Sequence, residues 1–371
     1  MKTIAFTAIV KNEEVNIIKC LDTVKSLCDK FVILDTGSSD KTVQVLEKYF
    51  SDNNLSGKVI SDPWVSFATN RSNALDQARK LDCDYILMMD ADETMHYKEG
   101  FELNDFKSSL SSQVYDVETN LDIIYYRPLL LRSDLNCFYK SVVHEYLECP
   151  DDFESRSRAP NIYVTSSLDG CRSRESDNKF LKDAEVLKKE LETEKDEFLI
   201  SRYTFYLAES FKNSGNNLEA VKYYRKRTSQ GFWSQEVFES YYSMAKCFER
   251  MGEKPEIIIA TYLQAFEFEP SRAESLHDLA FYCRSKEWFN LGYMYASRGL
   301  DIEYPENGLF VKKWIYDYGL KDEAAVCAYW TGDYKTSYKL TKELLEENLF
   351  PEDQRLRIEE NLKFAEEKLA E

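Results

Sequence analysis

The sequence predicts an α/β domain with a mostly parallel sheet, followed by an all-α helical repeat domain. Three observations support this fold class. Short apolar runs alternate with helical stretches in the first half, polar turn residues follow several of those runs, and an alanine–glycine spacing recurs in the second half. The chain has 371 residues, which is long enough for two domains, and its 43% hydrophobic content is typical of folded proteins.

Apolar runs in the first half predict strands at 3–10, 31–34, 58–61 and 85–89, and the segments between them predict helices at 13–27, 41–49 and 67–80. Asp40 stands where it can cap the helix that starts at 41. Strands that alternate with helices imply a Rossmann-like, mostly parallel sheet covered by helices. Ligands of such sheets bind at the carboxyl ends of the strands.

The segment from 114 to 150 is less regular, with extended stretches at 123–126 and 129–131. A loop-like connection at 153–174 and a highly charged helix at 177–197 follow it. We therefore expect a catalytic domain at 1–150, a linker with a connecting helix at 151–197 and a helical domain at 198–371.

The second half carries a repeat that can be counted. Four alanines each precede, by seven residues, a glycine or in one case a glutamate; the pairs are Ala208–Gly215, Ala245–Gly252, Ala280–Glu287 and Ala325–Gly332. The alanines lie 37, 35 and 45 residues apart, close to the roughly 34 residues of a tetratricopeptide (TPR) repeat. The long third interval leaves a generic helical bundle as an alternative. Aromatic side chains of these helices either form the repeat core, which is the commoner case, or stack on sugars; they are Tyr203, Phe205, Tyr206, Tyr241 and Tyr242.

Charge and segment composition exclude several classes. The formal net charge of −18 disfavours nucleic acid and anionic membranes as partners. No run approaches the roughly 18 apolar residues of a membrane span. The apolar start at 1–10 is interrupted by Thr3 and Thr7 and lacks a cleavage site, so we interpret it as a buried strand rather than a signal peptide. Nine cysteines without a CxxC pair are typical of reduced thiols, and we expect a cytoplasmic protein.

Asp90-Ala91-Asp92-Glu93 follows the strand at 85–89 directly. Carboxylates at positions i and i+2 after a strand can meet one hard divalent cation, which would act as a Lewis acid on a diphosphate leaving group. Acidic triplets are also common at exposed turns, so this motif alone does not decide between a metal site and a solvated loop.

Three further polar segments precede this motif. In chain order the four are Ile9-Val10-Lys11-Asn12-Glu13-Glu14, Leu34-Asp35-Thr36-Gly37-Ser38-Ser39-Asp40, Phe67-Ala68-Thr69-Asn70-Arg71-Ser72-Asn73 and Met89-Asp90-Ala91-Asp92-Glu93. Together they resemble the GT-A domain of glycosyltransferase family 2, in particular its stand-alone members with an appended helical repeat domain. The family usually has Ala-Arg-Asn in the third segment, and the departure here leaves open whether Asn70 or Asn73 contacts the ligand.

The resemblance implies a nucleotide site made of Val10, Asn12, Glu13, Asp35, Gly37, Ser38, Asn70, Arg71, Asn73 and Asp90. Within it, Arg71 would face the diphosphate and Asp35 would accept a hydrogen bond from the base or ribose. Structural alternatives remain for three of these residues: Glu13 as a helix cap, Asp35 as a turn residue and Arg71 as a partner in a surface ion pair.

Metal ligation by Asp92, Asp90 and His144 also follows from the resemblance, with Asp92 in direct contact and Asp90 bridging towards the ribose or a bound water. A packed histidine is the alternative for His144. We expect His277 to be structural and His96 to lie in a mobile loop. The candidates for the catalytic base are Glu145 and Glu93, and Glu145 is alternatively a residue that orients the site.

The predicted function is that of a metal-dependent, inverting hexosyltransferase with a nucleotide-sugar donor, UDP-linked by family frequency, and Mn²⁺ or Mg²⁺. The acceptor would be a hydroxyl of a glycan, protein or lipid-linked intermediate held by the repeat domain, which could alternatively mediate homodimer formation. One competing hypothesis is an inactive transferase domain joined to a protein-interaction scaffold. Another is a nucleotidyltransferase, which would have a Gly-rich basic loop where this chain has Lys11-Asn12-Glu13-Glu14.

Overall fold

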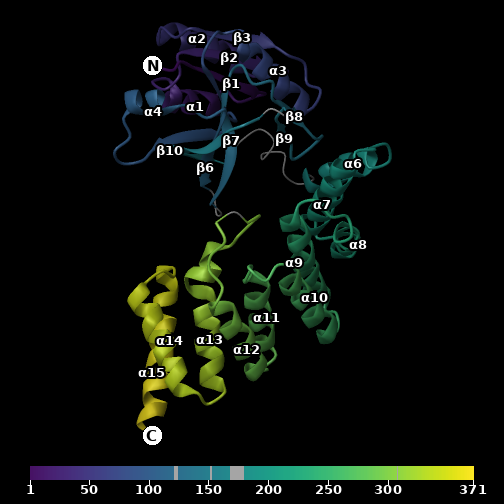
Figure 1. Cartoon of the computed structure of the whole chain (residues 1–371), viewed down its shortest axis with the longest axis vertical. Coiled ribbons are helices and arrows are strands. Elements are labelled where there is room, and N and C mark those ends of the chain that lie inside the picture. The colour runs from purple at the N-terminus through teal and green to yellow at the C-terminus, as the bar shows by residue number, and fades with distance from the viewer. Residues whose placement is uncertain (121–123, 151–152, 168–178, 307) are drawn as a thin grey trace. The chain divides into compact units, whose positions relative to one another are not determined.

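A computed structural model describes residues 1–120, 124–150, 153–167, 179–306 and 308–371 (Figure 1). The chain forms two compact units, Met1–Glu190 and Leu191–Glu371.

The first unit is built on an eight-stranded sheet of order β3-β2-β1-β4-β7-β6-β10-β5. Its strands are β1 (Ile4–Val10), β2 (Lys30–Asp35), β3 (Gly57–Ser61), β4 (Tyr85–Met88), β5 (Glu93–Tyr97), β6 (Val114–Asn120), β7 (Ile124–Arg132) and β10 (Arg156–Ser166). The first four strands are parallel, as the sequence predicted, whereas β7 pairs antiparallel with both β4 and β6. Two short strands, β8 (Phe138–Lys140) and β9 (Tyr146–Glu148), form a separate antiparallel hairpin.

Helices cover both faces of this sheet. They are α1 (Asn16–Val24), α2 (Thr42–Asp52), α3 (Phe67–Arg79) and α4 (Leu103–Ser109), and the unit ends with a further helix, α6 (Lys179–Glu190). Alternate residues of β1 enter opposite cores: Phe6 and Ala8 pack in the core that contains residues of α1, α2 and α4, whereas Ala5 packs in the core that contains residues of α3. This two-residue alternation is the pleat of a strand that is buried on both faces.

Two expectations for the end of this unit are wrong. The connection expected to be loop-like at 153–174 contains β10, which lies between β6 and β5 in the sheet, while 168–174 fall outside the described residues. Only Ile162 and Val164 of β10 are deeply buried, so the apolar signal was too short to predict a strand. The sheet therefore extends past residue 150, the expected end of the domain.

The other correction concerns β7. The two extended stretches expected at 123–126 and 129–131 are one strand, from Ile124 onwards in the described residues. Pro128 interrupts the apolar run without ending the strand, because a register shift between Tyr115 and Asp116 of β6 occurs beside it.

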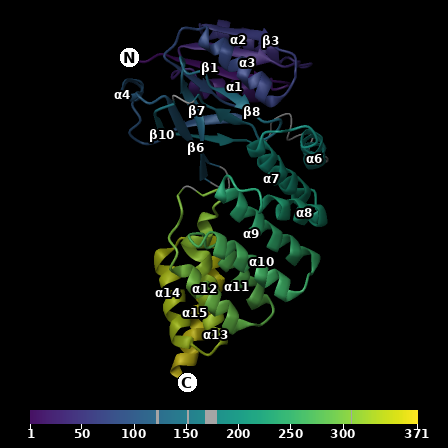
Figure 2. The same ribbon diagram turned by 45° about the vertical axis from the view of Figure 1, so that its right-hand side comes forward.

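The second unit consists of paired helices. They are α7 (Glu197–Asn213), α8 (Asn217–Arg227), α9 (Ser234–Met251), α10 (Pro255–Phe268), α11 (Glu274–Ser285), α12 (Phe289–Leu300), α13 (Leu320–Trp330), α14 (Tyr334–Glu347) and α15 (Arg355–Ala370). Figure 2 shows successive pairs stacked beside one another, and each helix contacts its neighbours in the chain. The expected connecting helix corresponds to α6, which has buried residues on one face and is therefore not fully solvated.

Backbone conformation confirms the register of the repeat. The four anchor alanines are buried at the contacts between helices. The residue seven positions after each anchor is left-handed: φ is 81° at Gly215, 68° at Gly252 and 85° at Gly332. Glu287 adopts the same conformation, with φ of 61°, although it carries a side chain. Four equivalent helix ends identify a TPR-like array rather than a generic bundle.

The long third interval has a structural cause. A segment at 301–319, which ends in a π-helix (Ile315–Gly319), separates α12 from α13. This insert contacts earlier repeats: Lys312 Nζ lies 2.5 Å from the hydroxyl of Tyr242, and the backbone nitrogen of Leu309 lies 3.3 Å from Oε1 of Gln235.

The aromatic side chains of α7 and α9 belong mainly to the core of this unit. Tyr203, Phe205 and Tyr242 are buried, and Tyr206 and Tyr241 pack against the same cluster. This agrees with the core interpretation rather than with sugar stacking.

Candidate active site

The candidate site lies at the carboxyl ends of the parallel strands. Val10 at the end of β1 pairs with Asp35 at the end of β2, which pairs with Ser61 at the end of β3. Because β2 and β3 lie on one side of β1 and β4 on the other, the loops that follow β1 and β4 diverge. Open α/β sheets bind ligands in the crevice at such a point.

Hydrogen bonds join the loops after β1 and β2 into one rim. Asn12 has a left-handed backbone, with φ of 55°, which turns the chain sharply after β1. Its backbone nitrogen donates to the hydroxyl of Ser38 at 2.9 Å, and its side-chain oxygen accepts from the backbone nitrogen of Ser39 at 2.8 Å. The backbone nitrogen of Thr36 donates to the carbonyl of Val10 at 2.9 Å. The two loops therefore present a single, fixed edge.

The carboxylates of Asp35 and Glu13 both accept hydrogen bonds from neighbouring groups of the chain at this rim. The Asp35 carboxylate accepts hydrogen bonds from the backbone nitrogens of Gly37 at 3.3 Å and Ser38 at 3.2 Å. Gly37 has a φ of 107°, which permits this tight turn. The Glu13 carboxylate accepts from the amide of Asn16 at 3.0 Å. The turn role expected as an alternative for Asp35 is thus present, and any contact with a ligand would be additional to it.

Asn70 and Asn73 lie on α3, beside the loop that follows the carboxyl end of β3. The Asn70 amide donates to the Asp62 carboxylate at 2.7 Å and its side-chain oxygen accepts from the backbone nitrogen of Val65 at 2.9 Å. The Asn73 amide donates to the same carboxylate at 3.1 Å. Both amides therefore hold the loop between β3 and α3, and their hydrogen bonds there favour a structural role over ligand contact.

Five charged side chains form a continuous row beside this rim. In spatial order they are Glu145, Arg71, Asp90, Arg127 and Glu93, with each carboxylate next to a guanidinium. Arg71, from α3, pairs with both Glu145 and Asp90. Arg127, from β7, pairs with Glu93 and lies 3.8 Å from Asp90. We call these five residues the ionic row.

The pKa values of two carboxylates of the ionic row, Asp90 and Glu93, are shifted in opposite directions. Burial raises the pKa of Asp90, but the charges of Arg71 and Arg127 outweigh it, and the pKa of Asp90 lies below its ordinary value. Glu93 is only 3% exposed, and this burial raises its pKa despite the opposing charge of Arg127. Glu93 also accepts a hydrogen bond from the backbone nitrogen of Asp90 at 2.9 Å, so its carboxylate braces the loop after β4.

Sequence reasoning missed Arg127. The signal was present, because a lone arginine stands in the apolar run Ile123-Ile124-Tyr125-Tyr126-Arg127-Pro128-Leu129. A buried strand tolerates a cation only where carboxylates compensate it, and the two that do so here belong to a distant segment. Only the strand order of the sheet, in which β7 lies next to β4, shows that Arg127 is close to Asp90 and Glu93.

Glu145 and His144 lie on the segment that connects β8 to β9. This hairpin packs on α3: the Ser72 hydroxyl accepts from the backbone nitrogen of Tyr139 at 2.9 Å, and the Tyr139 ring lies 5.8 Å from the Arg71 guanidinium. Glu145 thereby reaches Arg71, whereas His144 is exposed on a left-handed backbone with φ of 52°.

The other two histidines lie in regular structure. His96 is in β5 rather than in the expected mobile loop, and its ring stacks on Tyr163 at 4.8 Å. His277 is buried in α11, 2.8 Å from Asp278, which supports the structural role expected for it.

The described side chains near the ionic row include few donors for a metal ion. Within the part of the chain that the structure describes, no group of three or more His, Cys, Asp or Glu side chains is arranged to hold a metal ion. Asp90 lies between two guanidinium groups, which makes it a poor direct ligand in this arrangement. Asp92 is partly exposed in the turn before β5. One carboxylate fits Mg²⁺ or Mn²⁺ only where phosphate oxygens and waters complete the shell, as is usual at diphosphate sites.

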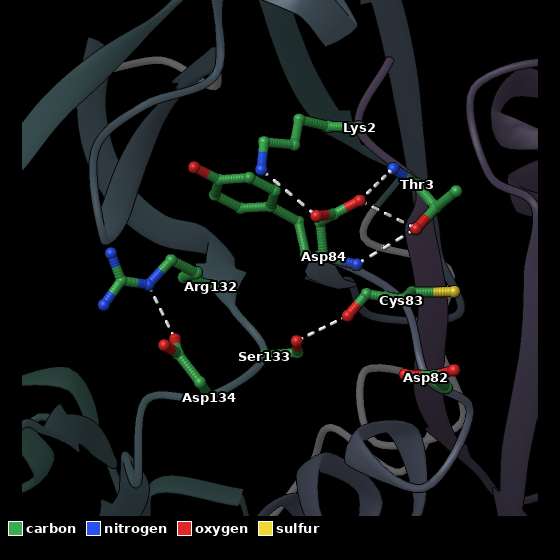
Figure 3. A pocket seen from close by; sticks show the side chains of 9 residues that line it. Lys2, Thr3, Asp82, Cys83, Asp84, Arg132, Ser133 and Asp134 are labelled. Atoms are coloured by element: carbon green, nitrogen blue, oxygen red, sulfur yellow. Dashed lines mark hydrogen bonds and ion pairs between the residues drawn. The ribbon is translucent and has the colours of Figure 1, made fainter.

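A second group of charged residues lies at the opposite ends of the parallel strands. Its ion pairs do not form a row like the one beside the rim. Figure 3 shows this pocket, in which Asp84 bonds to Lys2 at 3.1 Å and to the backbone nitrogen of Thr3 at 2.8 Å, while Arg132 bonds to Asp134 at 2.6 Å. Lys2, Asp84, Arg132 and Asp134 have local partners there, and the pocket is at the amino ends of β1 and β4, away from the rim.

Fold and site together define the class as an α/β domain of GT-A type joined to a TPR-like repeat array. Residues 8–99 match the family model "Glycosyl transferase family 2", and the chain therefore carries a glycosyltransferase family 2 domain. The matched segment includes the rim, Arg71, Asp90 and Asp92. Within the residues that the structure describes, no helix is long and apolar enough to cross a membrane.

Relatives support both halves of this description. The chain is 33% identical over 95 residues to an uncharacterized glycosyltransferase of Rickettsia typhi, which covers 26% of this chain and 30% of that protein. It is 25% identical over 324 residues to a TPR repeat-containing protein of Synechococcus elongatus, covering 81% of this chain and 72% of the relative. The chain thus spans less than a third of the length of the Rickettsia relative.

Solved structures that resemble the chain include a tetratricopeptide repeat protein from Parabacteroides merdae. It is 14% identical, with a TM-score of 0.39, and the match covers 53% of this chain and 69% of that one.

Proposed function

We propose that the first unit transfers a hexosyl group from a nucleotide-diphosphate sugar to a hydroxyl group, with inversion at the anomeric carbon. The observation that carries this proposal is the ionic row, which borders a fixed rim at the carboxyl ends of parallel strands in a family 2 domain. Glycosyl transfer is the chemistry of the family. The donor, the metal and the acceptor are part of our proposal.

The rim would receive the nucleotide. Val10, Asn12 and Ser38 present backbone and hydroxyl groups at its edge, and Asp35 lies just behind them. Arg71 and Arg127 supply the positive charge that a diphosphate needs in a chain of net charge −18. Guanidinium groups that now face Asp90 can exchange one anion for another, so a diphosphate has two cations to bind. Uridine diphosphate is the favoured nucleotide, by family frequency.

Asp92 is the residue that would hold Mn²⁺ or Mg²⁺ against the diphosphate, and Asp90 would orient the ribose or a bound water. When bound, such an ion stabilises the negative charge that develops on the leaving diphosphate. His144 lies outside the row, and its role as a further ligand stays a prediction.

Glu145 is our choice for the base that takes the proton of the acceptor hydroxyl. Glu93 is less suitable, because it is almost fully buried and its carboxylate is engaged by Arg127 and by the backbone of Asp90. Glu145 is also paired with an arginine, Arg71, and its side chain is 9% exposed. However, it lies at the end of the row, on the segment between β8 and β9 rather than inside the sheet, and the hydrogen bond to the backbone of the loop after β4 is made by Glu93. A single displacement needs one such carboxylate beside the attacking oxygen.

The repeat unit would supply the acceptor. Its helices expose several aromatic side chains, including Trp233, Trp314 and Trp330, on which a glycan or peptide can pack. We propose that this unit recruits the acceptor-bearing molecule, glycan or protein.

Binding measurements with the full chain test this function. Melting temperature is followed with UDP-, GDP- and dTDP-sugars, each with and without Mn²⁺. One donor should stabilise the protein in a metal-dependent manner, by about 2.7 kcal/mol at a hundredfold excess over its dissociation constant. Asp92→Asn should abolish the metal-dependent part.

Asp134→Asn is the matched control, since it removes an exposed carboxylate at the opposite edge of the sheet. It should leave donor binding unchanged. Failure of every nucleotide sugar to stabilise the protein with metal would refute the enzyme and favour the scaffold hypothesis.

A further inference from the structure

Two thiols face each other at the base of the β8–β9 hairpin. The sulfur atoms of Cys137 and Cys149 lie 3.3 Å apart. Cys137 directly precedes β8 and Cys149 directly follows β9, next to the last strand pair, Phe138 with Glu148. The two cysteines thus occupy opposed positions on neighbouring antiparallel strands, where a disulfide can form after a small approach of the side chains.

Their burial is complementary. Cys137 is 1% exposed, whereas Cys149 is partly exposed. A reagent from solution therefore reaches Cys149 first. Cys137 lies next to it and is the second thiol to react. This is the arrangement of an attacking and a resolving cysteine.

The chemistry of this pair differs from that of the other described cysteines. Burial raises the pKa of six thiols elsewhere in the chain, those of Cys20, Cys28, Cys83, Cys247, Cys283 and Cys327. A hydrogen bond from Cys137 lowers the pKa of Cys149, and the nearby charge of Arg156 acts in the same direction against burial. A thiol with more thiolate character reacts faster with oxidants.

We propose that Cys137 and Cys149 form a reversible oxidation site that reacts with low-molecular-weight disulfides and cross-links the base of the hairpin. The site is separate from the ionic row, although the hairpin that it closes carries Glu145 and His144.

The reaction is a two-step thiol–disulfide exchange. The Cys149 thiolate attacks one sulfur of the small disulfide, forms a mixed disulfide and releases one small thiolate. Cys137 then gives up its proton to solvent, and its sulfur attacks the Cys149 sulfur and releases the second small thiolate. The two cysteines lose two electrons in total, and the small disulfide gains them. An excess of small thiol reverses both steps.

Oxidation should restrain the hairpin. A cross-link at 137 and 149 joins the two strands at the end opposite the connecting turn, so the loop at 141–145 is closed from both sides. We expect slower amide hydrogen exchange at 138–148 in the oxidised protein. Any effect on sugar transfer would rest on the proposed function, whereas formation of the link does not.

Mass spectrometry of the full chain tests the site. The protein is incubated with glutathione disulfide, blocked with an alkylating reagent and digested with trypsin. We expect peptide 133–140 linked to peptide 141–156, with a loss of about 2 Da relative to the two free peptides, since two hydrogens leave when a disulfide forms. Reduced glutathione should restore the two thiols, and hydrogen exchange at 138–148 should follow the same change.

Two variants separate the possible outcomes. Cys137→Ser should leave a stable glutathione adduct on Cys149, because the second thiol is missing, and Cys83→Ser, at a buried thiol elsewhere, should still form the link. The proposal is wrong if the wild-type chain retains glutathione on Cys149, or if both thiols are alkylated after treatment. Neither result would depend on whether the protein binds a nucleotide sugar.

Discussion

Arginine–carboxylate pairs occur in both units, yet they differ in balance and in access to solvent. In the repeat unit, Arg272 pairs with Glu274 and Arg227 pairs with Glu236, and all four side chains are at most 3% exposed. In the ionic row, two guanidinium groups serve three carboxylates, and the Asp90 side chain is 33% exposed. The repeat pairs are sealed and carry no excess negative charge, since Glu236 has a second cation in Arg202, whereas the row carries excess negative charge that solvent reaches.

This difference separates structural ion pairs from a candidate site. Arg227 also donates to the backbone carbonyl of Gly231 at 2.9 Å, so its donors are used to join the end of α8 to the start of α9. The arginines of the row bind side chains: Arg71 pairs with Asp90, and Arg127 pairs with Glu93 and donates to the hydroxyl of Thr119 at 3.2 Å. Burial of an arginine is therefore a weak sign of function, and incomplete compensation at a strand edge is a stronger one.

Breaking a sealed pair should have the largest effect on stability. We expect Arg272→Met to lower the free energy of unfolding of the repeat unit by about 3–5 kcal/mol, because Glu274 is left buried without its cation. Chemical denaturation of the full chain, followed by tryptophan fluorescence, measures this loss. All five tryptophans serve as probes, four of them in the second unit.

The double variant Arg272→Met/Glu274→Leu is the control for this prediction. Replacing both charges with apolar groups should recover most of the lost stability. Donor binding should be unchanged in both variants, and a loss of donor binding would contradict the distinction drawn between the two kinds of pair.

An arginine of the row should affect binding more than stability. We expect Arg71→Met to reduce sugar transfer about 100- to 1000-fold, because a cation that faces the diphosphate is lost. The melting temperature should fall less than in Arg272→Met, since Asp90 keeps Arg127 and is 33% exposed. Glu145, which loses its cation, is 9% exposed, against 1% for Glu274. Arg132→Met, which removes an exposed arginine at the opposite edge, should retain activity. A large fall in stability with unchanged kinetics would assign Arg71 to the structural class instead.

A smaller effect is expected at the left-handed helix ends. Glu287→Gly should raise the stability of the repeat unit by about 0.5–1 kcal/mol, since a side chain disfavours positive φ by roughly 1–2 kcal/mol and glycine recovers part of this through its own entropy cost. Gly215→Ala, at the equivalent position of another repeat, should lower stability by a similar amount. Equal stabilities for both variants and the wild type would contradict the repeat register.

Local patterns in the sequence predicted the fold where the pattern itself determines structure. The seven-residue spacing from Ala208 to Gly215 fixes where a helix ends, so the repeats followed from it directly. β10 was missed because its pairing with β6 and β5, rather than its composition, makes it a strand. The resemblance left open whether Asn70 or Asn73 contacts the ligand, and the hydrogen bonds of both amides to Asp62 are visible only in the structure.

The site was predictable in part for the same reason. Asp90 and Asp92 follow a strand, which places them at the sheet edge from sequence alone. Their neighbours Arg127 and Glu145 come from segments 37 and 55 residues after Asp90, and no local pattern encodes that proximity.

The insert at 301–319 has a consequence for how the repeat unit unfolds. Repeat arrays behave as one-dimensional chains, in which each repeat interacts only with the next and the ends can unravel independently. The contact between Lys312 and Tyr242 spans 70 residues and links the segment before α13 to α9, bypassing the repeats between them. This contact couples repeats that are not neighbours in the chain. The middle of the array should therefore unfold as one cooperative unit rather than one repeat at a time.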